Sequence, residues 1–183
     1  YKKFSLKLFK ITGIDSEFIE SGLLCIDPPN KENILNWVKN NNLNINECSF
    51  SNLPSYLFPS VTQIRPPRLM KAIRLFMQEI GINIRENTNL IKPKKESDSI
   101  KSWPTTENEK IKADIFVITS GAWTSNLVND YEDIIYPVRG QMIQYKKIEV
   151  NIKHVLYSDD FYVLQRKDGV ILAGSTVENV GFD

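Results

Sequence analysis

The sequence predicts a mixed α/β fold of the α+β class, in which an antiparallel sheet is combined with an incomplete parallel α/β segment. Three observations predict it. A strong amphipathic helix over 67–80 leads through Gly81 into a short strand over 82–85, which is the second half of an α/β crossover. The run 113–119 is almost uniformly apolar, as in a strand buried on both faces of a parallel sheet. From residue 134 onward, short β-rich segments alternate with turns.

The first part of the chain predicts two short helices and a pair of strands. Phe4 and Leu8 fall on one helical face, and Gly13 ends that helix. Prolines and aromatics crowd the stretch that follows the second helix, which favours irregular structure. The segments in order are a helix over 1–10, strand–turn–strand over 18–26, a helix over 31–41 and irregular structure over 50–66.

The second part begins with the helix over 67–80. Pro67 suits its first turn and Gly81 the position after its end. The polar stretch 92–112 predicts a solvated, loose hairpin with its tip at 94–101. A short helix over 124–130 and an antiparallel meander complete the chain. The meander strands are expected at 141–148, 152–157, 160–165 and 170–176.

Composition excludes several classes of protein. The 183 residues are 42% hydrophobic and 25% charged with a net charge of +1, so we expect neither a nucleic-acid partner nor a basic binding field. No apolar run approaches the ~18–20 residues that span a bilayer, so no membrane partner is expected. Cys25 and Cys48 match no metal spacing, and a reducing, cytoplasmic compartment is favoured over a disulfide. His154 is the single histidine, and no metal site is expected.

Three places could carry chemistry. The turn 119–123 follows the predicted buried strand, where open α/β sheets bind ligands, although a plain turn would look the same. Residues 137–142 join a rigid turn, Arg139 and a glycine ahead of a strand, and a surface arginine in a β-turn is the alternative. Tyr162 lies on a predicted strand, where its hydroxyl could bind a carboxylate or simply belong to the core.

Taken in order, these segments closely resemble the FAD-dependent D-amino-acid oxidase superfamily, and within it the glycine oxidase branch associated with thiamine biosynthesis. The resemblance covers nearly the whole chain, although Gln165 replaces a usual proline and 92–112 carries no family signal. The segments that carry it are Gln63–Leu69, Gly81–Ile84, Ala113–Trp123, Pro137–Met142, Phe161–Gly169 and Leu172–Asp183.

The resemblance implies a two-domain flavoprotein. Residues 1–61 and 131–183 would belong to the substrate domain, and 62–130 to the FAD-binding domain. The family's dinucleotide fingerprint lies before this stretch, and a substrate-clamping arginine lies after it. We therefore expect an interior fragment that by itself neither holds FAD tightly nor turns over.

The resemblance also implies roles for individual residues. Tyr162 would be the active-site tyrosine that helps to hold the substrate carboxylate, and Val177 would line the substrate pocket. Arg139 belongs to a family motif and would either contact the cofactor or fix the turn. The other expected FAD contacts are Leu90, which would touch the adenine end, and Ser120, Gly121 and Trp123 in the cofactor turn.

The implied reaction is oxidation of a small amino acid by hydride transfer to FAD, followed by reoxidation with O₂ to give H₂O₂. A homo-oligomer is implied by the resemblance alone. Alternatives are a sister D-amino-acid or sarcosine-type dehydrogenase, or the oxidoreductase half of a tRNA-modifying enzyme. A non-catalytic binding or assembly module and an unrelated α/β domain also remain open.

Overall fold

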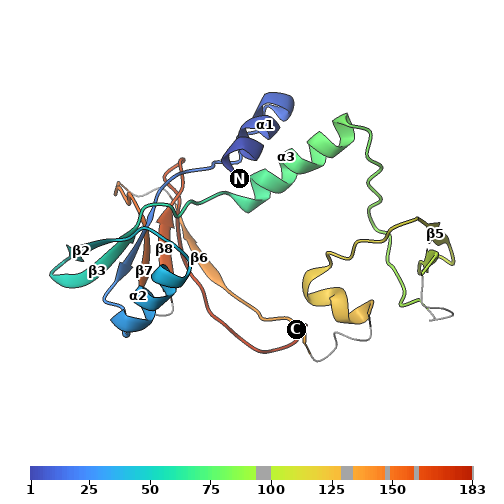
Figure 1. Ribbon diagram of the computed structural model, residues 1–183. Coiled ribbons are helices and arrows are strands. Elements are labelled where there is room, and N and C mark those ends of the chain that lie inside the picture. Colours follow the sequence, from blue (N-terminus) through green and yellow to red (C-terminus); the bar gives the residue numbers. More distant parts are fainter. Residues whose placement is uncertain (94–99, 129–133, 147–148, 159–160, 183) are drawn as a thin grey trace. The chain divides into compact units, whose positions relative to one another are not determined.

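The computed structural model describes residues 1–93, 100–128, 134–146, 149–158 and 161–182. The chain folds into two compact units (Figure 1). Unit 1 consists of Tyr1–Asn83 and Gly140–Thr176, and unit 2 consists of Ile84–Arg139 and Val177–Asp183. Each unit is therefore built from two stretches that are distant in the sequence.

Unit 1 is organised around a seven-stranded sheet with the strand order β2-β3-β1-β7-β8-β9-β6. Only β1 and β7 pair in parallel, and the remaining neighbours are antiparallel. This confirms the predicted mixed fold with a mostly antiparallel sheet. The strands are β1 (Leu23–Ile26), β2 (Asn46–Phe50), β3 (Leu53–Phe58), β6 (Met142–Tyr145), β7 (Val155–Ser158), β8 (Phe161–Gln165) and β9 (Ile171–Gly174).

The predicted meander is present in β7, β8 and β9, which follow one another along the chain and across the sheet. The turn between β8 and β9 closes with Gly169 at φ 84°, and the Gly169 N–H donates to the Arg166 carbonyl at 3.0 Å. β6 then pairs with β9 and completes that edge.

The expectation of irregular structure over 50–66 is wrong for its first part, because β2 and β3 form a hairpin there. Ser51 and Asn52 make the connection with φ of 51° and 66°, the left-handed pair that tight hairpins require. β3 lies inside the sheet and buries Tyr56 and Phe58. The strand was not expected because proline usually argues against one. Pro54 is tolerated here because it lies near the beginning of β3.

The three helices of unit 1 agree with the predicted ones: α1 (Lys2–Thr12), α2 (Lys31–Asn40) and α3 (Pro66–Glu79). α1 packs against α3 (Figure 1), and each buries one side chain completely, Leu8 and Ala72. α2 contributes Val38 to a core that it shares with the sheet residues Cys25, Tyr56 and Phe58. Leu8 is buried as expected, whereas Phe4, which was placed on the same helical face, is 40% exposed.

Unit 2 contains a short hairpin and a 3₁₀ helix. β4 (Ser102–Pro104) pairs with β5 (Lys110–Lys112), and η1 covers Gly121–Asn126. A hairpin was expected over 92–112, but its predicted tip lies largely outside the described residues. The expected helix over 124–130 is represented by the end of η1, and its last residues also lie outside the described part.

The strands predicted at 82–85 and 113–119 do not form among the described residues. Ile115 and Val117 are 80% and 79% exposed, whereas the prediction placed them in a buried strand. The physical reason is that a strand is defined by hydrogen bonds to a neighbouring strand. An apolar sequence can favour a strand, but it cannot supply that neighbour.

Candidate functional site

The first part of the candidate site is an apolar cavity of about 220 Å³ in unit 2. It brings together Leu90 and Ser120, two of the residues expected to contact a cofactor. Trp103, Phe116 and Leu127 line it as well, and sequence reasoning missed them. Trp103 lies in the stretch 92–112 that carried no family signal, so only the fold shows that Trp103 lines this cavity.

The walls of this cavity are fixed by backbone pairing and ring packing. Leu90 forms an isolated bridge with Thr105, and the neighbouring Ile91 N–H donates to the Pro104 carbonyl at 2.9 Å. Trp103 is only 2% exposed and meets Phe116 edge-on, with ring centroids 5.5 Å apart. Edge-to-face contacts of this kind add stability beyond the burial of apolar area.

The turn after Thr119 closes the cavity on another side. Ser120 Oγ lies 3.0 Å from Thr124 Oγ1, and the Trp123 N–H donates to the Ser120 carbonyl at 3.1 Å. Gly121 has φ 55° and nothing within 4 Å of an added Cβ, so backbone conformation rather than crowding favours glycine. Trp123 points elsewhere: it is 60% exposed and stacks beside Phe182 at 5.7 Å.

The cavity fits one ring system of a cofactor such as FAD. Its volume lies below the roughly 300–1,000 Å³ that holds a whole drug-sized ligand. Apolar walls and the Ser120 hydroxyl suit a heteroaromatic ring. The buried Trp103 Nε1–H has no hydrogen-bond partner among the described residues, which is rare for a buried donor.

Arg139 and Val177 occupy another part of unit 2. The Arg139 guanidinium donates to Glu178 Oε2 from Nη2 at 2.6 Å and from Nε at 3.2 Å. The backbones of Arg139 and Glu178 also bond to each other twice, at 2.9 Å. Arg139 is therefore held against Glu178, and both roles expected of it, contacting the cofactor or fixing the turn, stay predictions. Val177 is 76% exposed and has no place in the cavity of Leu90 and Ser120.

Tyr162 belongs to unit 1, on β8. Its partners across the sheet are Tyr157 on β7 and Gly174 on β9, and Gly174 in turn pairs with Met142 on β6. The Tyr162 hydroxyl donates to Met142 Sδ at 2.8 Å. A Cβ on Gly174 would lie 2.7 Å from Met142 Cγ. The Met142 side chain therefore fits against β9 because residue 174 is a glycine.

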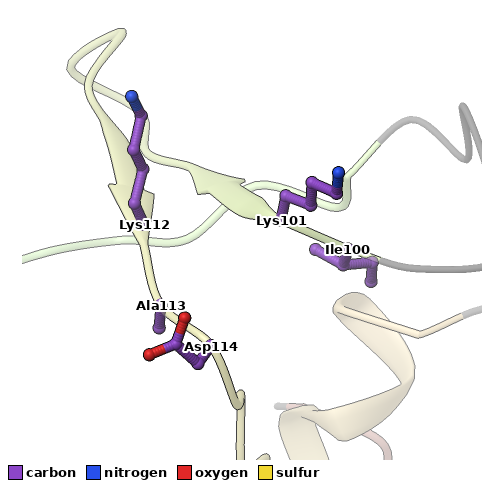
Figure 2. Close-up of a pocket in the computed structure, with 5 residues that line it drawn as sticks. All are labelled: Ile100, Lys101, Lys112, Ala113 and Asp114. Carbon is purple, nitrogen blue, oxygen red and sulfur yellow. The ribbon is translucent and has the colours of Figure 1, made fainter.

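A second hollow in unit 2, of about 580 Å³, lies beside the β4–β5 hairpin. Figure 2 shows the ammonium groups of Lys101 and Lys112 directed away from the Asp114 carboxylate. Charges of both signs line this exposed hollow, so it favours no single class of ligand. Among residues 1–93, 100–128, 134–146, 149–158 and 161–182, no group of histidine, cysteine and acidic side chains could hold a metal ion.

Comparisons with known proteins agree on one family. The model of the family described as FAD dependent oxidoreductase matches residues 6–183. Glycine oxidase of Pseudomonas aeruginosa is 27% identical over all of this chain and 54% of its own length, and that of Pseudomonas putida is 26% identical. The bifunctional protein ThiO/ThiG of Synechocystis is 22% identical over 98% of this chain.

Solved structures show the same fold. Glycine oxidase from Bacillus cereus superposes with a TM-score of 0.85 at 19% identity, covering 100% of this chain and 55% of that one. Iminodiacetate oxidase from Chelativorans superposes with a TM-score of 0.75 at 16% identity. The chain spans about half the length of the glycine oxidases that it matches. No described helix is long and apolar enough to cross a membrane.

Proposed function

This chain belongs to the FAD-dependent oxidoreductase family, and on that premise we propose that it is part of a glycine oxidase. The observation that carries the proposal is the family match over residues 6–183, together with relatives named glycine oxidase that align with the whole chain. The identity of 27% supports a flavin-dependent amine oxidase in general, and the choice of glycine as its substrate is the more specific part of the proposal.

FAD, when bound to the full-length protein, would accept a hydride from a small amino acid and pass the electrons to O₂, giving H₂O₂. Leu90 and Ser120 would hold one ring of FAD in the cavity they share, and Gly121 and Trp123 would contact another part of the cofactor, outside that cavity. Arg139 would either contact the cofactor or fix the turn that precedes β6, with Glu178 holding its guanidinium.

The substrate side of the proposal rests on Tyr162 and Val177. The Tyr162 hydroxyl, which here donates to Met142 Sδ, would turn to the substrate carboxylate, because a carboxylate oxygen is a far stronger acceptor than a thioether sulfur. Val177 would line the substrate pocket. In this scheme residues 1–61 and 131–183 form the substrate domain, and 62–130 form part of the FAD domain.

The proposed setting is a cytoplasmic enzyme, homo-oligomeric when complete, that supplies its oxidised product to thiamine biosynthesis. The relative named ThiO/ThiG supports the last point. A sister amine oxidoreductase is the second candidate, since iminodiacetate oxidase and the L-amino acid deaminase of Proteus vulgaris share the fold with TM-scores of 0.75 and 0.73.

The test uses the full-length protein. Anaerobic mixing with glycine should bleach the bound flavin, and readmission of air should restore its colour with release of H₂O₂. Flavin that is reduced by another amine but not by glycine would move the assignment to a sister enzyme. A full-length protein that binds no flavin would favour a non-catalytic module.

A further inference from the structure

Met142 holds a thioether sulfur directly against the hydroxyl of Tyr162. The hydroxyl donates to Met142 Sδ at 2.8 Å, although a thioether sulfur is only a weak acceptor. The two residues come from β6 and β8, which lie on either side of β9, and both pair with Gly174. The register of three strands therefore fixes which side chain meets this hydroxyl.

Gly174 makes the contact possible. Neighbouring strands lie about 4.8 Å apart, so β6 and β8 are separated by roughly twice that distance. Two long side chains can bridge such a gap only when the strand between them carries no side chain at that point. An added Cβ on Gly174 would collide with the Met142 side chain. Tyr162, Gly174 and Met142 thus form one packed unit across the sheet.

The Met142 side chain is also open to small oxidants. It is 54% exposed, and β6 is the last strand at its end of the described sheet. Exposed methionine is readily oxidised to the sulfoxide. If the Tyr162 hydroxyl holds the substrate carboxylate, the space beside Met142 Sδ has to stay open to small molecules in the full-length protein as well.

We propose that Met142 is a modification site, at which the H₂O₂ made by the enzyme oxidises the thioether to a sulfoxide and so weakens substrate binding. The peroxide comes from the proposed function, on which this inference rests. The O–O bond of H₂O₂ breaks, the sulfur supplies the electron pair of the new S–O bond, and the second oxygen leaves as water. The sulfur is oxidised by two electrons, and the peroxide is reduced by two.

The sulfoxide would compete with the substrate for Tyr162. Oxidation turns an apolar side chain into a polar one, whose oxygen accepts hydrogen bonds far better than the thioether sulfur does. The Tyr162 hydroxyl would then stay on residue 142, and the substrate carboxylate would lose this donor. One neutral hydrogen bond shifts an equilibrium about two- to tenfold, so we expect the KM for glycine to rise by that factor with little change in kcat.

The experiment uses the full-length, flavin-loaded protein and two matched variants. Met142→Leu removes the sulfur at the proposed site, and Met70→Leu removes one from α3 that is 62% exposed. Each protein is either treated with H₂O₂ or taken through many turnovers of glycine, and is then freed of peroxide. Peptide mass spectrometry locates every added oxygen. The KM for glycine and the Kd for acetate, followed through flavin absorbance, are compared with the untreated sample of the same variant.

Wild type and Met70→Leu should gain an oxygen at Met142 under both treatments, and both constants should rise about two- to tenfold. Methionine sulfoxide reductases should remove the oxygen and restore the original values. Met142→Leu should keep its own KM and Kd after either treatment. Acetate carries the carboxylate but no amine, so its Kd reports the Tyr162 hydroxyl without turnover.

Two kinds of result overturn the inference, and they are distinguishable. If glycine reduces the flavin but Met142 stays unoxidised, or its oxidation leaves both constants unchanged, the modification site is wrong while the proposed function stands. If no amine reduces the flavin, the proposed function fails, and the inference falls with it because its source of peroxide is gone.

Discussion

Single residues in unit 1 form a network of charges that joins three distant segments. Arg65, at the beginning of α3, donates to Glu17 Oε1 at 3.0 Å and to Asp168 Oδ2 at 2.8 Å. Glu17 is only 4% exposed. Lys167 adds a bond to Asp15 Oδ2 at 2.7 Å. The network fastens the β8–β9 turn to α3 and to the loop before β1.

Asp168 should make folding stability depend on pH. The hydrogen bond from Arg65 holds the pKa of the Asp168 carboxyl below its usual 3.8. Because the folded protein prefers the ionised form, this stabilisation is fully present well above pH 3.8 and is lost as the pH falls through and below that value. Since Asp168 is about half exposed, Asp168→Asn should lower the free energy of unfolding at neutral pH by only about 0.5–1 kcal/mol.

Urea unfolding of the full-length protein at a series of pH values measures this difference. The gap between wild type and Asp168→Asn should close in acid. Glu47→Gln, which removes the partner of the exposed Lys31, is the control and should cost less. A gap that stays constant down to pH 2 would contradict the assigned cause.

Tyr162→Phe should slow the proposed reaction without unfolding the sheet. Removing a hydrogen bond to a charged group costs roughly 1.5–3 kcal/mol, so kcat/KM for glycine should fall about 10- to 100-fold. Tyr145→Phe on β6 is the control, and its kcat/KM should stay near the wild-type value. Equal kinetics of the two variants would exclude a substrate contact by Tyr162.

At the scale of elements, the packing of β6 against β9 depends on Gly174. An added Cβ would lie 2.7 Å from Met142 Cγ and 3.2 Å from Met142 Cα, and the backbone atom cannot move away cheaply. Gly174→Ala should therefore lower the free energy of unfolding by about 1–3 kcal/mol, as overpacking does.

The same clash predicts a rescue. Met142→Ala removes Cγ, so the double variant should be more stable than the sum of the two single changes. Chemical denaturation of the four proteins completes the cycle. Strict additivity would mean that the Met142 side chain is not what Gly174 accommodates.

Elements differ in how far the sequence could predict them. α1, α2 and α3 were predictable because a helix satisfies its own backbone hydrogen bonds, and its apolar residues recur in the sequence with the period of the helix. The hairpin of β2 and β3 was missed, since its turn residues Ser51 and Asn52 resemble an ordinary polar loop. The apolar run 113–119 was mistaken for a paired strand, because pairing depends on another segment.

At the scale of the whole molecule, the cavity that joins two of the expected cofactor contacts among the described residues is small. The described cavity of Leu90 and Ser120 measures about 220 Å³, enough for one ring but not for a dinucleotide. We expect the 183-residue chain, purified alone, to retain no stoichiometric FAD, whereas the full-length protein should be yellow. Visible absorbance after dialysis checks both, and a yellow 183-residue chain would refute this expectation.

The sequence by itself determined the helices, the meander and the family. The helices and the meander follow from local periodicity and turn residues, and the family follows from motifs that keep their order along the chain. Only the tertiary structure decided which residues share a site. It joined Leu90 to Ser120 and Trp103, gave Arg139 its partner Glu178, and set Cys25, Tyr157 and Tyr162 in one row. These relations are contacts between distant segments, and strand register and ring packing, rather than any local pattern, fix them.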